Sequence, residues 1–144
     1  MQRVCDILAH KGSHVYDIDP EATVYDAIGV MATREIGALL VTQNGNPVGI
    51  ISERDYTRNV ILKDKSSKDT RVSDIMTSDL ITVSSHEHVD SCVSLMKQHH
   101  IRHLPVSDDG VVVGMLSFRD LFSAIIDEQA HVIEDLEHYV RGEV

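Results

Sequence analysis

Apolar positions follow two kinds of pattern along the chain, and their order predicts a mixed unit of helices and strands. Between residues 24 and 31 they recur at the three- and four-residue spacing of an amphipathic helix, and Thr23 with Asp26 three residues later resembles a capping box at its start. Short apolar runs at 38–41 and 48–51 flank polar turn residues at 43–46, which predicts two strands joined by a tight hairpin. Ser52 then opens a second helical stretch. This part of the chain therefore predicts helix, strand, strand, helix.

The same order of elements recurs 65 positions later. Residues 24–61 align with 89–126 without a gap and share 12 identities over 38 positions, whereas unrelated chains match at roughly one position in 15 to 20. A short strand precedes each copy, near 16–18 and near 81–83. The chain is therefore a duplication, and each copy predicts strand, helix, strand, strand, helix.

A short lead-in segment precedes each repeat, and the two lead-ins differ in length. Residues 4–8 resemble 72–76 at an offset of 68, so the first lead-in is three residues longer, a stretch that includes 11–13. The polar stretch between the repeats has the composition of a linker. We predict four segments: a first unit at 1–62, a linker at 63–71, a second unit at 72–127 and a C-terminal helix at 128–144.

The end of the chain predicts a long helix with one apolar stripe. Such a helix packs either on its own domain or on a partner subunit, and the sequence favours neither alternative. The stripe consists of Ile125, Val132, Ile133, Leu136, Tyr139 and Val140.

Composition and charge restrict the class of function. Hydrophobic residues make up 42% of the 144, enough for a real core. No apolar run approaches the roughly 20 residues that cross a bilayer, and the first residues lack the apolar stretch of a signal peptide. We therefore expect a cytoplasmic protein that binds no membrane. The formal net charge of −10 argues against nucleic-acid binding, which requires a basic surface.

Of the two cysteines, Cys92 falls in a helical stripe and is expected to be buried.

A Gly-apolar-apolar-Ser-x-Arg-Asp motif ends each hairpin and carries the candidate chemistry. Its glycine permits close approach of a backbone or a ligand. Its serine begins a helix, where free N–H groups and the helix dipole favour a phosphate. Its aspartate can accept hydrogen bonds from ribose hydroxyls, and its arginine suits phosphate oxygens. Ser-x-x-Asp is also an ordinary helix cap, and the two roles are compatible. The motif residues are Gly49, Ser52, Arg54 and Asp55, then Gly114, Ser117, Arg119 and Asp120.

Two such motifs in duplicated strand-helix-strand-strand-helix units resemble the cystathionine β-synthase (CBS) domain family. The segments 36–41 and 101–106 also look like the central strand of that family, and 72–77 looks like its lead-in. The resemblance spans about residues 4–126. It implies a tandem α/β (α+β) pair of β-α-β-β-α units with pseudo-two-fold symmetry, often called a Bateman module, that commonly forms a homodimer. It also implies clefts between the units for AMP, ADP, ATP or NAD(H), and a sensor role toward a regulated protein that the sequence does not identify.

The resemblance implies a set of ligand-binding positions, and these differ between the two copies. Gly37 and Ala38 correspond to Arg102 and His103, so one copy leaves room for an adenine ring while the other offers groups for phosphates. The two sites are therefore expected to differ in ligand or affinity. In full, the implied nucleotide-binding residues are Asp17, Ile18, Gly37, Ala38, Ser52, Arg54, Asp55, Arg58, Thr82, Arg102, His103, Leu104, Pro105, Ser117, Arg119 and Asp120.

Three further classes of function are weighed against a nucleotide sensor. A metal site is not expected, because the nine histidines show no set of three or four converging ligands. An enzyme, such as a nucleotide hydrolase using Asp55 or Asp120, lacks a nucleophile-base pair and a phosphate loop. The remaining alternative is a structural interaction protein that acts through its C-terminal helix. We expect a non-catalytic, adenine-nucleotide-binding regulatory module with no catalytic residues.

Overall fold

The computed structural model describes residues 2–142 and divides the chain into two compact units. We call His14–Ile81 the first-repeat unit. The second-repeat unit combines Met1–Ser13 with Thr82–Val144. Each unit thus contains the body of one repeat together with the lead-in that precedes the other repeat in the sequence. The spatial units differ in this respect from the consecutive segments 1–62 and 72–127.

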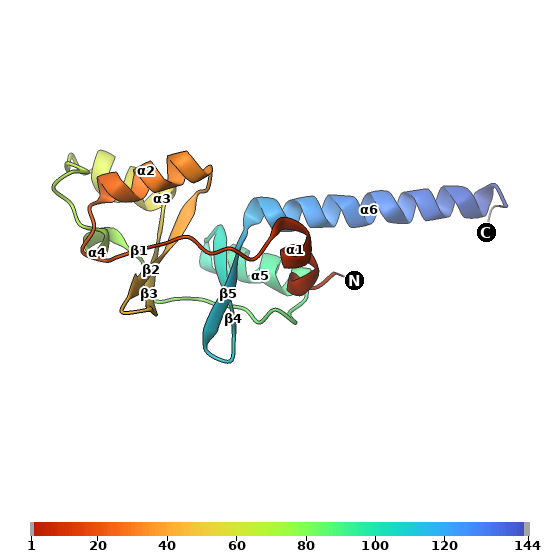
Figure 1. Cartoon of the computed structure of the whole chain (residues 1–144). Helices are drawn as coiled ribbons and strands as arrows, with labels where there is room; N and C mark the ends of the chain where they lie inside the picture. Colours follow the sequence, from red (N-terminus) through yellow and green to blue (C-terminus); the bar gives the residue numbers. More distant parts are fainter. Residues whose placement is uncertain (1, 143–144) are drawn as a thin grey trace. The chain divides into compact units, whose positions relative to one another are not determined.

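The first-repeat unit is a three-stranded sheet with helices packed on it (Figure 1). Its strands β1 (Asp17–Ile18), β2 (Ala38–Gln43) and β3 (Asn46–Ser52) lie in the order β1-β2-β3, with β1 parallel and β3 antiparallel to β2. Its helices are α2 (Val24–Arg34), α3 (Glu53–Tyr56), the π-helix η1 (Thr57–Ile61) and α4 (Val72–Ile75). The hairpin turns at Asn44 and Gly45, where both φ angles are positive and glycine is therefore favoured.

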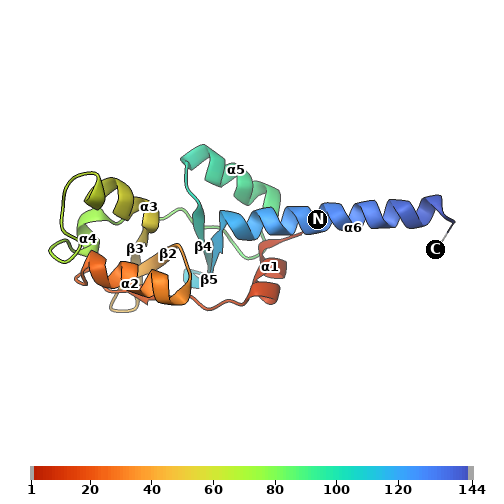
Figure 2. The same cartoon turned by 90° about the horizontal axis from the view of Figure 1, so that it is seen from above.

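The second-repeat unit repeats this plan with a two-stranded sheet and a longer final helix (Figure 2). Its hairpin consists of β4 (His103–Asp108) and β5 (Val111–Ser117), and Val83 adds a parallel bridge to Val106. Helices α5 (Val89–His99) and α6 (Phe118–Val140) pack on the hairpin and on each other, and α1 (Val4–Lys11) packs on α6.

The order strand, helix, strand, strand, helix is confirmed in the first repeat, whereas in the second repeat the strand expected near 81–83 is reduced to the single bridge of Val83 to Val106. Thr23 caps α2 as its spacing to Asp26 predicts, since the Asp26 N–H donates to the Thr23 hydroxyl at 3.1 Å. The final helices differ from the expectation in one respect. The second repeat and the C-terminal stretch form a single helix, α6, without a break at 127–128, whereas the first repeat ends in α3 and η1. No helix in the described part of the chain is long and apolar enough to span a bilayer.

Each lead-in docks through the same three backbone hydrogen bonds. In each unit, the first two residues of the lead-in helix donate to the loop before the longer helix, and the first residue of that longer helix donates back to the lead-in. The pairs from donor to acceptor are Val72 to Ala22, Ser73 to Pro20 and Val24 to Thr70, and correspondingly Val4 to Glu87, Cys5 to Ser85 and Val89 to Gln2, all between 2.8 and 3.1 Å.

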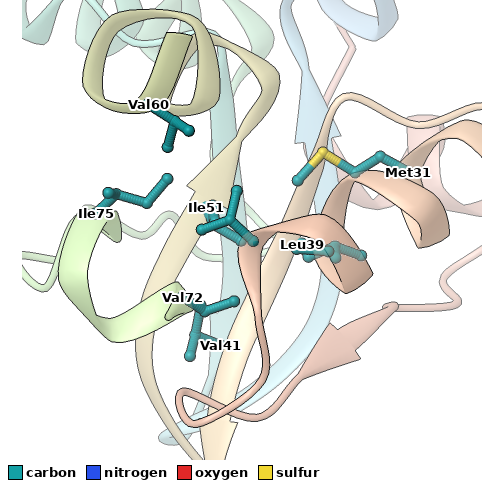
Figure 3. Close-up of a cluster of buried hydrophobic side chains, with 9 residues drawn as sticks. Met31, Leu39, Val41, Ile51, Val60, Val72 and Ile75 are labelled. Carbon is teal, nitrogen blue, oxygen red and sulfur yellow. The ribbon is translucent and has the colours of Figure 1, made fainter. Parts of the chain in front are cut away.

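The lead-in helices also complete the hydrophobic cores. In the first-repeat unit, Val72 and Ile75 of α4 pack with Leu39, Ile51 and other residues of the sheet and helices (Figure 3). In the second-repeat unit, α1 contributes three buried residues, while Cys92 is fully buried as expected. Burial raises the pKa of the Cys92 thiol to about 11, with a smaller contribution from Glu87, so this thiol stays protonated at neutral pH. The α1 residues in this core are Val4, Ile7 and Leu8.

Helix α6 buries only the beginning of its length. Leu121 and Ala124 are its buried residues, whereas the apolar side chains from residue 132 onward are 53% to 82% exposed. The structure therefore does not place this part of the stripe against the protein's own units. The exposed residues are Val132, Ile133, Leu136, Tyr139 and Val140.

Candidate functional site

In the first repeat, the predicted serine and aspartate form one hydrogen-bonded cluster at the start of α3. The Ser52 N–H donates to Asp55 Oδ2 at 2.9 Å, and the Ser52 hydroxyl donates to the same oxygen at 3.1 Å. The Asp55 N–H donates back to Ser52 Oγ at 3.3 Å. The cluster is a capping box, so the capping role of the motif is confirmed.

In the second repeat, the equivalent cluster has an additional member. The Ser117 N–H donates to Asp120 Oδ2 at 2.8 Å, and the Asp120 N–H donates to Ser117 Oγ at 3.1 Å. The Lys11 ammonium from α1 also lies 2.7 Å from Asp120 Oδ2 and donates to the Met115 carbonyl at 2.9 Å. Lys11 therefore donates to the aspartate oxygen that corresponds to the one accepting from the Ser52 hydroxyl in the first repeat.

The residues that differ most between the repeats lie directly beside these caps. Ala38 pairs with Ser52 across the hairpin, and His103 pairs with Ser117. The first helical N–H of α3 donates to the Gly37 carbonyl at 3.0 Å, and that of α6 donates to the Arg102 carbonyl at 2.7 Å. The structure thus brings the small pair 37–38 and the basic pair 102–103 to equivalent places.

The environments of the two clusters shift the pKa values of two of their members. Burial raises the pKa of Asp55, and this effect exceeds the opposing influence of its Ser52 hydrogen bonds and of the nearby Arg54 and Arg58. Burial lowers the pKa of His103 to about 4, against an attraction from Asp120, so His103 is neutral at pH 7. A neutral imidazole offers one donor and one acceptor, which suits the edge of a nucleobase.

Other predicted site residues lie further from the caps or are buried. The Asp17 carboxylate accepts a hydrogen bond from the Thr42 hydroxyl at 2.7 Å, which directs it away from the Ser52 end of β2. Leu104 belongs to the core, and Pro105 is also buried, so their side chains are not available to a ligand. Ile18 is partly buried in β1, and the exposed Thr82 directly precedes the bridging residue Val83. Arg58, Arg102 and Arg119 are exposed, whereas Arg54 is partly buried.

The motif glycines have a packing role. The sequence left open whether a backbone or a ligand approaches them. A Cβ on Gly49 would lie 2.7 Å from Met76 Sδ and 2.9 Å from the Thr77 carbonyl oxygen. A Cβ on Gly114 would lie 2.8 Å from both methyl groups of Leu8. In both repeats, the segment that approaches the glycine is therefore the docked lead-in.

Lys11 is the site residue that sequence reasoning missed. It comes from a different element than the motif, 109 positions before Asp120. The available signal was the three-residue excess of the first lead-in, which lengthens α1 to 8 residues compared with 4 in α4. No group of three or more His, Cys, Asp or Glu side chains within residues 2–142 is arranged to hold a metal ion.

Two repeats of one α+β unit, each with a capped Ser-Asp cluster at its second helix, define a tandem regulatory module. The chain belongs to the CBS domain family, whose model matches residues 6–61 and 72–127. The mitochondrial CBS domain-containing protein CBSX3 of Arabidopsis thaliana is 41% identical over 125 residues, 83% of this chain but 61% of that protein. A protein with CBS domains from Burkholderia ambifaria is 43% identical, with a TM-score of 0.86 over 89% of this chain and 96% of that one.

Two further solved structures show what similar proteins bind or form. The CBS domain pair of protein MJ0100, 25% identical with a TM-score of 0.79, is in complex with 5′-methylthioadenosine and S-adenosylmethionine. The match covers 89% of this chain and 98% of that one. A CBS-CP12 protein from bloom-forming cyanobacteria, 27% identical with a TM-score of 0.76, is hexameric. That match covers 84% of this chain and 66% of the other.

Proposed function

We propose that this protein is a non-catalytic regulatory module that binds adenine nucleotides and reports the energy or redox state of the cell. AMP, ADP or ATP are the leading ligands, with NAD(H) as the alternative dinucleotide. The observation that carries the proposal is the recurrence of one polar cluster, serine, aspartate and the start of a helix, at the same place in both repeats. The adenosine-type ligands of the MJ0100 pair support this class of ligand.

The chemistry of the cluster suits the ribose and phosphate of a nucleotide. Within residues 2–142, the hydrogen bonds that the Asp120 carboxylate accepts from Ser117 and Lys11 both reach Oδ2, which leaves Oδ1 to accept from a ribose hydroxyl. The start of α6 attracts a phosphate through its dipole, and the exposed Arg119 offers a guanidinium beside it. The other positions that the family resemblance implies, including Asp17, Ile18 and Thr82, stay predictions.

The two sites are proposed to be unequal. Gly37 and Ala38 present little side chain beside Ser52, whereas Arg102 and His103 present a cation and a neutral imidazole beside Ser117. The second-repeat site is therefore proposed to take the more highly phosphorylated ligand.

The signal would pass to another protein, through an assembly of at least two copies. The exposed apolar stripe of α6 from Val132 to Val140 supports a contact with a second copy. The hexameric CBS-CP12 protein shows that a similar chain assembles. The regulated protein is unidentified, nucleic acid and membrane are not proposed as partners, and location in the cytoplasm stays a prediction because the Arabidopsis relative is mitochondrial.

Titration calorimetry with AMP, ATP and NADH tests the proposal, with Asp120→Ala as the key variant. This variant should weaken binding to the second-repeat site at least tenfold, because it removes a charged acceptor. Asp6→Ala is the matched control: the Asp6 carboxylate accepts a similar capping hydrogen bond from the Arg3 N–H at 2.9 Å, but lies outside the candidate site. Equal affinity of the two variants would contradict a ligand role for Asp120. Turnover of a nucleotide in the same sample would favour the alternative of a hydrolase.

A further inference from the structure

Lys11 distinguishes the second-repeat site from the first-repeat site more sharply than any motif residue. The three additional residues of the first lead-in extend α1 by a turn, and Lys11 is the last residue of that turn. The second lead-in lacks this turn, because α4 ends at Ile75. The first-repeat cluster therefore has no lysine at this place.

The ammonium of Lys11 occupies the carboxylate that the proposed ligand needs. It lies 2.7 Å from Asp120 Oδ2, and the two side chains are 36% and 20% exposed. In the first repeat, the Ser52 hydroxyl donates to the corresponding oxygen of Asp55. The Ser117 hydroxyl oxygen accepts from the Asp120 N–H, and among residues 2–142 the hydroxyl donates to no acceptor. Lys11 is therefore a donor to Asp120 that the first-repeat cluster lacks, and the Ser117 hydroxyl is left as a donor for a ligand.

We propose that Lys11 makes the second-repeat site selective for phosphorylated nucleosides over nucleosides. This inference rests on the proposed function. One ribose hydroxyl can use Asp120 Oδ1, whereas the vicinal hydroxyl competes with the ammonium for Oδ2. A 5′-phosphate compensates for that competition, because it offers Lys11 a new anionic partner within reach of the flexible lysine side chain. A nucleoside without phosphate offers no such partner and leaves the lysine charge partly unpaired.

The test compares AMP with adenosine in titration calorimetry of the full chain. Binding to the second-repeat site is identified as the component of the titration that Asp120→Ala removes. At this site of the wild-type protein, AMP should bind more tightly than adenosine. Lys11→Met should weaken AMP about tenfold, the size of one charge-assisted hydrogen bond. The same variant should leave adenosine binding unchanged or tighter, because Asp120 is no longer occupied. The ratio of the two affinities should therefore fall at least tenfold.

Two control variants separate this role from a structural one. Lys11→Arg keeps the charge and should keep most of the preference for AMP. Lys65→Met removes the same charge from an exposed position in the other unit and should change neither affinity. Equal weakening of both ligands in Lys11→Met, or an unchanged ratio, would overturn the inference while leaving the proposed function intact. If neither ligand binds the wild-type chain, the proposed function fails and the inference fails with it.

Discussion

The replacement of Gly49 by alanine tests whether the motif glycine serves the lead-in rather than a ligand. The added Cβ would lie 2.7 Å from Met76 Sδ and 2.9 Å from the Thr77 carbonyl oxygen. The Met76 side chain can turn aside. The Thr77 oxygen cannot move alone, because it accepts from the Ile50 N–H at 3.0 Å, and the Thr77 N–H donates to the Ile50 carbonyl at 2.9 Å.

The expected cost follows from these contacts. Overpacking against a fixed backbone atom costs about 1–3 kcal/mol, and a weakened backbone hydrogen bond adds up to about 1 kcal/mol. A loss of about 2–3 kcal/mol corresponds to a fall in Tm of roughly 5–10 °C for a chain of this size. Urea unfolding followed by circular dichroism measures the loss in free energy of unfolding.

Two other glycines serve as internal standards. The Cβ of Gly114→Ala would have the Leu8 side chain as its nearest neighbour, and that side chain can rotate, so this change should cost about 1 kcal/mol. Gly29→Ala adds a methyl group to open space within α2 and should stabilise the chain by about 0.5–1 kcal/mol. If Gly49→Ala were as stable as the wild type but bound nucleotide poorly, the glycine would serve the ligand, and our interpretation of the packing would be wrong.

Two further predictions concern protonation and assembly. His103 has a pKa of about 4 in the folded chain, below its ordinary 6.5, so its contribution to stability should be complete above pH 6.5 and be lost as the pH falls toward 4. His103→Gln should flatten this dependence in urea unfolding at pH 7, 5.5 and 4.5, and identical slopes for the two proteins would contradict the assignment. Deletion after Asp127 removes the exposed part of the α6 stripe and should reduce the mass measured by light scattering at unchanged secondary structure of the two units. An unchanged mass would exclude α6 as a subunit contact.

Much of the fold could be predicted from sequence because the repeat displays each pattern twice. Helical spacing, hairpin turn residues and the capping pair Thr23 and Asp26 are local signals, and the structure confirms them. The cluster of Ser52 with Asp55 is also local, since its members are three residues apart.

Features that depend on distant parts of the chain could not be predicted in this way. The docking of each lead-in on the other repeat's body rests on backbone hydrogen bonds, which carry no side-chain signature. The contact of Lys11 with Asp120 spans 109 positions and required the length of α1 to be known. The end of the second helix of each repeat was also hard to predict. The two stretches have similar apolar spacing in sequence, but the first ends with η1 at Ile61 and the second continues as α6 to Val140.

The exchange of lead-in segments has a consequence for how such a chain can arise and fold. In this structure the lead-in helix of each repeat closes the hydrophobic core of the other repeat. Two separate copies could each satisfy the other, but only at a concentration that brings them together. Joining the copies in one chain supplies that concentration through the connecting segment, so an association between molecules becomes an intramolecular step. The duplication therefore supplies both closing helices within one chain.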